Sequence, residues 1–126
     1  MAGLTLDSGA LIAFERGDRR LMAHLKEAEQ RGCTLTVPTA VVAEVWRGGP
    51  RAARIARLLE ACVIEPLHDT LARAAGKSVG EVKGAGVIDA VVVASAAARR
   101  DRILTSDPDD LERLQRRFPQ VLIVSI

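Results

Sequence analysis

Short apolar segments alternate with longer segments of helical spacing along the whole chain. The apolar, often β-branched segments predict strands at residues 4–6, 34–37, 63–67, 102–105 and 121–125. The longer segments predict helices at residues 10–16, 19–31, 39–47, 50–62, 70–77, 87–100 and 108–117. This alternation is typical of an α/β fold, so we expect one domain over residues 1–126, with a mostly parallel central sheet covered by helices on both faces. Such sheets bind ligands at the carboxyl ends of their strands, where the strand order switches.

Glycine and small polar residues predict where these elements begin and end. Gly32 is placed to end the second helix, and Thr39 and Asp69 are placed to cap the helices that follow them. Four glycines between Gly76 and Gly86 predict a loose segment ahead of the 87–100 helix. We expect this segment to be a mobile flap over a substrate groove, because it has few apolar anchors.

Four carboxylates interrupt apolar segments: Asp7, Glu44, Asp89 and Asp107. An ionised carboxylate beside a core is costly unless a counter-charge or hydrogen bonds compensate it. Four such positions on separate segments therefore predict one shared counter-ion. Oxygen ligands without histidine or thiolate favour Mg²⁺ or Mn²⁺ over zinc, and the chemistry they imply is hydrolysis of a phosphodiester by a metal-activated water.

Helix capping is the alternative explanation for three of these acids. Aspartate is a favoured N-cap, and Asp107 precedes Pro108, which suits the first turn of a helix. Capping would itself bring Asp7 and Asp107 to the same edge of the sheet. Glu44 has no capping role, because it lies inside the 39–47 helix. Asp110 is either a further metal ligand or part of the first turn of its helix, and the second reading is slightly favoured.

The composition limits the class of partner. Lys and Arg number 18 against 16 Asp and Glu, and only three of the cations are lysines, which favours bidentate contacts to phosphate. With 2% aromatic residues, a nucleic acid would be held through its phosphates rather than by base stacking. Arg47, Arg51 and Arg54 are candidates for RNA phosphate contact because they follow Glu44, although a solvated helix face also explains them.

The remaining features favour a soluble, cytosolic protein without a zinc site. Cys33 and Cys62 have neither paired spacing nor a nearby histidine, so we expect reduced, partly buried thiols. No apolar run approaches the roughly 18 residues of a membrane helix, and the N-terminus does not resemble a signal peptide. We therefore expect a cytoplasmic protein without a membrane partner.

With these residues in view, the chain resembles the PIN-domain family, and in particular the VapC-type toxins of type II toxin–antitoxin pairs. The resemblance extends over nearly the whole length and rests on four short motifs, each around one of the acids. They are residues 6–11 (LDSGAL), 43–46 (AEVW), 87–90 (VIDA) and 104–108 (LTSDP), the last followed by Asp110.

The resemblance implies a Rossmann-like α/β/α sandwich and a metal-dependent endoribonuclease. It assigns Mg²⁺ or Mn²⁺ to Asp7, Glu44, Asp89 and Asp107, with Ser8, Thr105 and Ser106 as candidates for hydrogen bonding within the site. It also implies a homodimer and a cognate VapB-type antitoxin, with operator DNA bound only through that antitoxin.

Other classes of protein remain as alternatives. A catalytically inactive PIN-like binding module would keep the fold, although all four acids are present here. A receiver-like phosphoacceptor domain groups acids at strand ends but needs a lysine after a late strand, where this chain has none. A haloacid-dehalogenase-type enzyme needs a second acid two residues after the first, where Gly9 stands.

Overall fold

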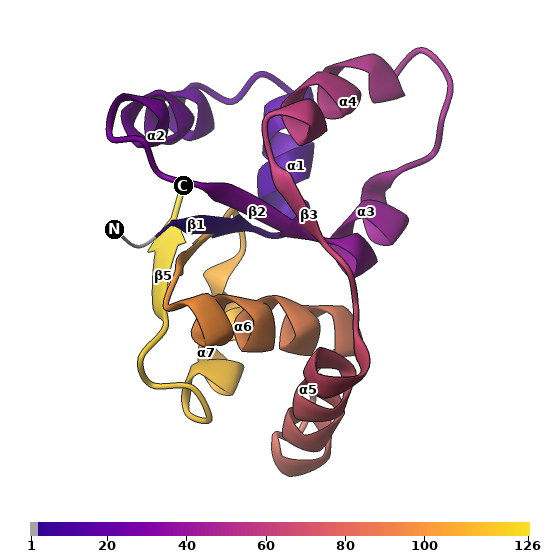
Figure 1. Cartoon of the computed structure of the whole chain (residues 1–126), viewed down its shortest axis with the longest axis vertical. Coiled ribbons are helices and arrows are strands. Elements are labelled where there is room, and N and C mark those ends of the chain that lie inside the picture. Colours follow the sequence, from indigo (N-terminus) through magenta and orange to yellow (C-terminus); the bar gives the residue numbers. More distant parts are fainter. Residues whose placement is uncertain (1–2) are drawn as a thin grey trace.

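Five parallel strands form one sheet at the centre of the molecule, in the order β3-β2-β1-β4-β5 (Figure 1). The computed structural model describes residues 3–126. Every neighbouring pair of strands runs parallel. The predicted α/β fold with a parallel central sheet is thereby confirmed. The strands are β1 (Leu4–Leu6), β2 (Leu35–Pro38), β3 (Val63–Glu65), β4 (Arg102–Thr105) and β5 (Leu122–Ser125).

Helices cover both faces of this sheet (Figure 1). One layer contains α1, α2 and α4, and the opposite layer contains α5, α6 and α7. Helix α3 lies at the carboxyl edge of the sheet and contacts both α1 and α6. The helices are α1 (Ser8–Glu15), α2 (Arg19–Gln30), α3 (Thr39–Val45), α4 (Ala52–Glu60), α5 (Asp69–Glu81), α6 (Val87–Arg99) and α7 (Pro108–Gln115).

The core lies between the sheet and helices α1 and α6. Leu6 and Leu104, on neighbouring strands, have no exposed surface, and neither does Leu11 of α1. Helix α6 is buried over most of its length, from Ala90 to Ala96. This explains why its sequence is apolar all round rather than amphipathic. Each large side chain buried in this way contributes roughly 1.5–3 kcal/mol to the hydrophobic term.

The strand order creates a switch point at the carboxyl end of β1. From β1 the chain proceeds to β2 on one side, whereas β4 pairs with β1 on the other side. Helices α1 and α7 start directly after β1 and β4, and α3 starts directly after β2. Their first turns therefore meet at one edge, which is the place where open α/β sheets bind ligands.

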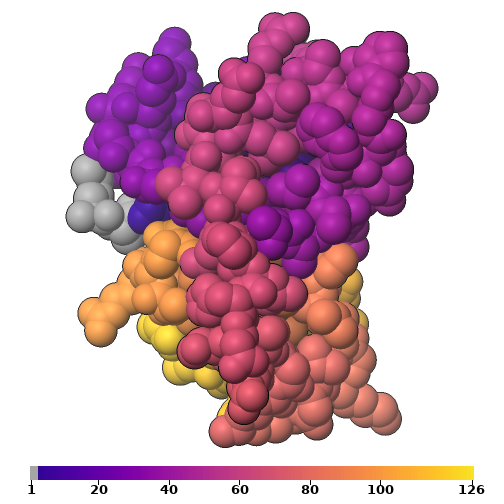
Figure 2. Space-filling view, turned by 45° about the vertical axis from the view of Figure 1, so that its right-hand side comes forward, coloured from indigo at the N-terminus to yellow at the C-terminus, as the bar shows by residue number. Residues whose placement is uncertain are grey.

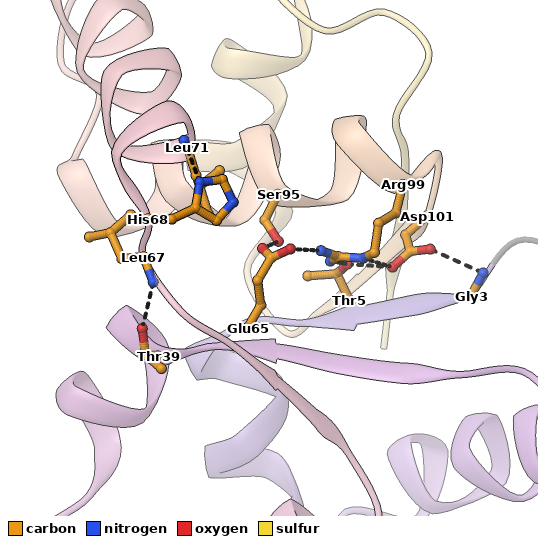
Figure 3. A network of polar contacts seen from close by, with 10 residues as sticks. All are labelled: Gly3, Thr5, Thr39, Glu65, Leu67, His68, Leu71, Ser95, Arg99 and Asp101. Carbon is orange, nitrogen blue, oxygen red and sulfur yellow. Dashed lines mark hydrogen bonds and ion pairs between the residues drawn. The ribbon is translucent and has the colours of Figure 1, made fainter.

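A buried polar network joins α6 to the sheet beneath it (Figure 3). The Arg99 guanidinium donates to Asp101 Oδ2 at 3.0 Å, to Glu65 Oε2 at 2.6 Å and to Thr5 Oγ1 at 2.8 Å. Thr5 Oγ1 in turn donates to Asp101 Oδ2 at 2.9 Å, and Ser95 Oγ donates to Glu65 Oε1 at 2.5 Å. One guanidinium faces two carboxylates, and the Gly3 amide and the Thr5 and Ser95 hydroxyls supply the remaining hydrogen bonds to them, so the role of the network is structural.

Several predicted helix ends are wrong, and local contacts explain the differences. Helix α5 continues through Gly76 to Glu81, so the loose segment before α6 is confined to residues 82–86. Leu71, Ala75 and Ser78 share a buried face of α5, which packs closely on α6. This burial outweighs the low helix propensity of glycine. The proposed flap can therefore include only the short loop from 82 to 86.

Two predicted caps are also wrong. The ring of His68, rather than Asp69, caps α5 by accepting from the Leu71 amide at 3.2 Å. Thr39 does not cap α3; its hydroxyl instead accepts from the Leu67 amide at 3.1 Å, which ties the start of α3 to the segment after β3 (Figure 3). Helix α3 ends at Val45, two residues earlier than predicted.

The two edge strands are only partly covered. Figure 2 shows the segment from β3 to α5 running over the surface between the two helical layers. Val63 of β3 is 54% exposed and Leu122 of β5 is 61% exposed, although the apolar sequence of the last strand favours burial. Within residues 3–126, no helix combines the length and the apolar character that spanning a membrane requires. The single-domain prediction also covers Met1 and Ala2, which lie outside the described residues.

Candidate functional site

Asp7 occupies the junction between β1 and α1. It is only 6% exposed, and its carboxylate caps α1 by accepting from the Ala10 amide at 2.9 Å. The side chain of Thr105, at the end of the neighbouring strand β4, also hydrogen-bonds this carboxylate. The capping explanation is thus correct for Asp7, and it fixes the carboxylate at the switch point of the sheet.

The surroundings of Asp7 oppose its ionisation. The pKa of its carboxyl is raised from 3.8 to about 6, chiefly by burial and to a smaller extent by the negative charges of Asp89 and Asp107, against the lowering effect of the two hydrogen bonds. Desolvation and like charges both disfavour the ionised form. A cation placed beside Asp7 would therefore stabilise its ionised form.

Asp89 is the residue that electrostatically connects the acids. It lies in the first turn of α6 and is half-buried. Its pKa is raised first by desolvation and then by the negative charges of Asp110, Glu44 and Asp107. Since Asp89 also raises the pKa of Asp7, all the predicted acids lie within electrostatic range of this one carboxyl.

Glu44 approaches the site from α3. Its side chain is exposed, and Oε1 accepts a hydrogen bond from the Ser8 hydroxyl in the first turn of α1. This contact joins two helices that follow neighbouring strands. Ser8 therefore orients the Glu44 carboxylate in the structure, and a role for Ser8 in the chemistry stays a prediction.

Asp107 differs from Asp7 in how its carboxylate is used. It stands at the N-cap position of α7 but makes no side-chain capping hydrogen bond, so the capping explanation is wrong for its carboxylate. Its backbone amide donates instead to Thr105 Oγ1 at 3.0 Å. Buried Thr105 thus contacts both Asp7 and Asp107, while the Asp107 carboxylate itself is exposed and free to meet a ligand.

Gly9 allows α1 to approach β4 closely. A Cβ atom at this position would collide with the Ser106 hydroxyl and lie 3.3 Å from the Ser106 amide and 3.4 Å from Asp7 Oδ1. Ser106, predicted as a hydrogen-bonding residue of the site, is thereby placed against the first turn of α1. The tightness of this junction holds the ends of β1 and β4 in register.

Asp110 lies in the first turn of α7, as the favoured reading predicted, and forms an ion pair with Arg113 at 3.5 Å. It is not the N-cap residue of that helix, and its charge is the first among those that raise the pKa of Asp89. Asp110 therefore belongs to the electrostatic neighbourhood of the site, although it is partly neutralised. Sequence reasoning missed Arg113, for which the i,i+3 spacing to Asp110 was the available signal.

The donor set fits a hard divalent cation. It consists of carboxylate oxygens, with a hydroxyl beside them, which Mg²⁺ and Mn²⁺ prefer. Within residues 3–126, Asp7, Glu44, Asp89 and Asp107 form no ion pair with a basic side chain. As placed, however, no three acidic, histidine or cysteine side chains of the described chain converge closely enough to hold a metal ion. A shared ion therefore stays a prediction.

The three arginines predicted to contact RNA lie around the connection from α3 to α4. Arg47 donates to the carbonyls of Ala43 at 3.3 Å and Trp46 at 2.9 Å. Arg54 stacks 5.8 Å from the ring centre of Phe14, near the opposite end of α1 from Asp7. Arg51 lines a pocket with Trp46. None of the three has a described contact with the acids.

Comparison with known proteins supports a single family. The pattern of the PIN domain matches residues 4–117, which is most of the chain. A comparison with curated proteins gave no match.

Solved structures of similar fold include several toxin–antitoxin complexes. VapBC2 from Rickettsia felis, bound to a fragment of promoter DNA, has a TM-score of 0.77 at 14% identity, with 98% of each chain covered. A toxin–antitoxin complex from Klebsiella pneumoniae has a TM-score of 0.75 at 19% identity, covering 98% of this chain and 100% of the other. VapBC-5 from Mycobacterium tuberculosis has a TM-score of 0.64 at 21% identity, with both chains fully covered. At these identities the likeness establishes the fold.

Proposed function

Because this chain belongs to the PIN-domain family, we propose that it is a Mg²⁺- or Mn²⁺-dependent endoribonuclease and the toxin of a VapBC-type pair. The observation that carries the proposal is the electrostatic connection of Asp89 with Asp7, Glu44, Asp107 and Asp110 at the carboxyl edge of the sheet. A buried acid with a raised pKa, such as Asp7, that lies at a switch point beside other acids is a candidate for catalysis.

Asp7, Glu44, Asp89 and Asp107 would hold the cation. When bound, the metal would activate a water for attack on phosphorus and neutralise the charge that develops on the phosphate. Asp7 supplies a carboxylate fixed by the Ala10 amide and Thr105, so its position requires little reorganisation. Ser8, on α1, donates a hydrogen bond to Glu44. Glu44 and Asp107 are exposed, so their side chains can adjust to the ion.

Partners follow from the same assignment. The similar structures reported above are described as VapBC or toxin–antitoxin proteins, and the one from Rickettsia felis is described as bound to a promoter DNA fragment. By analogy, this chain would pair with a VapB-type antitoxin, form a homodimer in the cytoplasm, and reach operator DNA only through that antitoxin. RNA is the substrate in this proposal.

The proposal is tested by incubating purified protein with total RNA and Mg²⁺, and sequencing the new 5′ ends. Asp7→Asn serves as the inactive variant, and Glu60→Gln, an exposed acid on α4, serves as the matched control. We expect discrete cleavage sites with wild type and Glu60→Gln, and their loss with Asp7→Asn or EDTA. Absence of cleavage by the wild type would favour the inactive binding module. Unchanged cleavage by Asp7→Asn would show that the acid site does not catalyse the reaction.

A further inference from the structure

A basic depression opens on the α5–α7 side of the molecule. It has a volume of about 410 Å³ and is formed where the end of α5 and the following loop meet α7. Its lining residues are Glu81, Val82, Lys83, Arg113, Arg116 and Arg117. Four of the six carry a positive charge, and we refer to this site as the basic pocket.

Two of these cations are not neutralised by the protein. Arg117 forms an ion pair with Glu81, and Arg113 forms one with Asp110. Lys83 and Arg116 are exposed and form no ion pair within residues 3–126. An open pocket with excess positive charge favours an anionic ligand.

The basic pocket lies beside the acidic site. Arg113 lines the pocket and pairs with Asp110, whose charge raises the pKa of Asp89. Arg113 also packs on the 82–86 loop, where a Cβ atom on Gly84 would lie 2.8 Å from its Nη1. Gly84 has a φ of 81°, which suits glycine, and the loop continues to Gly86, where a Cβ atom would lie 3.7 Å from Asp89 Oδ2. The two sites therefore share a loop and an ion pair.

We propose that the basic pocket binds a backbone phosphate of the RNA strand that flanks the cleavage position. This inference rests on the proposed function and names where the substrate is held. A strand lying over clustered acids meets repulsion at every phosphate except those beside the cation, so its neighbouring phosphates need a separate positive site. Lys83 and Arg116 supply that site, and Arg113 links it to the acids.

The pocket is a better candidate for this role than Arg47 or Arg54, two of the three arginines after Glu44. Arg47 already donates to two backbone carbonyls, and Arg54 lies over Phe14. Lys83 and Arg116, by contrast, have all their donors available within the described chain. Phosphate contacts of this kind carry no sequence information but determine affinity and position.

The test measures RNA binding separately from cleavage. Binding of a fluorescent single-stranded RNA is followed by anisotropy across a salt series, with Asp7→Asn in all proteins to prevent cleavage. Lys83→Ala/Arg116→Ala is compared with Arg20→Ala/Lys26→Ala, which removes the same charges from exposed positions on α2, in the opposite layer of the sheet. Cleavage by the same pairs is then measured with Asp7 intact.

We expect the pocket variant to bind RNA about five- to tenfold more weakly than the α2 control. The slope of log K against log salt should fall by about 0.7 for each phosphate that the variant no longer binds. Equal affinity and equal slope for the two double variants, with wild type binding and cutting RNA, would overturn this inference alone. Wild type that neither binds nor cuts RNA would overturn the proposed function and this inference with it.

Discussion

Thr105, at the end of β4, hydrogen-bonds the Asp7 carboxylate at the end of the neighbouring strand β1. Its hydroxyl oxygen also accepts a hydrogen bond from the backbone amide of Asp107 at 3.0 Å. One buried hydroxyl thus ties together two acids that are separated by 100 residues of sequence. The contact is possible because β1 and β4 are paired in parallel, with Leu6 opposite Leu104. Both strands therefore end at the same edge of the sheet. The acid site is therefore a product of the strand order.

Replacing Asp7 with Asn should abolish activity and strengthen the fold. The amide oxygen can still cap α1, while the charge that opposes Asp89 and Asp107 is removed. We expect RNA cleavage to fall by about 10²-fold or more, since an ionised ligand is lost. At pH 7.5 in EDTA, the free energy of unfolding should rise by about 1–3 kcal/mol, measured by urea denaturation. A less stable Asn variant would contradict the electrostatic account of this site.

The stability gain in Asp7→Asn should depend on pH in a defined direction. The pKa of Asp7 is raised from 3.8 to about 6 on folding, so the folded state holds its proton more tightly than the unfolded chain. Stability is therefore lost as the pH rises from about 4 to about 6, and the loss is complete above that range. The difference in unfolding free energy between wild type and Asp7→Asn should grow over this window and then remain constant. A difference that shrinks with rising pH would contradict the prediction.

Mg²⁺ or Mn²⁺ should stabilise the wild-type protein at neutral pH. A ligand that binds only the folded state raises the melting temperature, and neutralising the acids adds to this effect. We expect a rise in Tm with added metal that is larger at pH 7.5 than at pH 5, where Asp7 is largely protonated.

The matched variants separate site binding from general ion effects. Asp89→Asn should lose most of the metal-induced rise, because Asp89 is close to all the other acids. Glu60→Gln, which changes an exposed acid on α4, should keep it. Equal rises in both variants would show that the cations act elsewhere.

Much of this site follows from the sequence, because strand patterns predict where acids leave a parallel sheet. Asp7 follows β1 and Asp107 follows β4 as predicted, and Asp89 lies in the first turn of α6. The sequence does not predict, however, which of these carboxylates caps its helix. Asp7 caps its helix and Asp107 does not, although both stand at N-cap positions. The backbone of Asp7 is extended (φ −92°, ψ −177°), whereas that of Asp107 is not (φ −137°, ψ 87°).

The errors arose where tertiary packing outweighed local preference. Gly76 predicts a loop by propensity, but the face of Leu71, Ala75 and Ser78 is buried, with α5 packed on α6, and the helix continues. The contact of Arg113 with the Gly84 loop was missed because it depends on α7 lying beside a segment that is distant in sequence, whereas its i,i+3 pair with Asp110 is local.

Gly9→Ala should loosen the junction between α1 and β4. The added methyl group would meet the Ser106 hydroxyl, so α1 or Ser106 must shift. We expect lower thermal stability and reduced cleavage, and partial recovery of both in Gly9→Ala/Ser106→Ala, which removes the obstructing oxygen. The double-mutant cycle should give a coupling of about 0.5–1 kcal/mol. Strict additivity would show that the two residues do not compete for space.

Arg99→Met should destabilise the fold without altering the acid site. The substitution leaves Asp101, whose side chain is 5% exposed, and Glu65 without their cation (Figure 3). We expect a loss of about 2–4 kcal/mol in urea denaturation, because an unpaired buried charge is costly. Arg73→Met, which breaks an exposed pair with Asp69, should cause no measurable change. Similar losses in the two variants would contradict a special role for the buried network.

A crystal soaked in Mn²⁺ tests the central claim most directly, since the anomalous scattering of the metal reports its position independently of activity. We predict an anomalous peak at the carboxyl edge of β1 and β4, within bonding distance of oxygens from at least two of Asp7, Glu44, Asp89 and Asp107. The peak should be absent from Asp89→Asn crystals grown under the same conditions. Mn²⁺ bound elsewhere, with these carboxylates still apart, would contradict the assignment of this site as a metal centre.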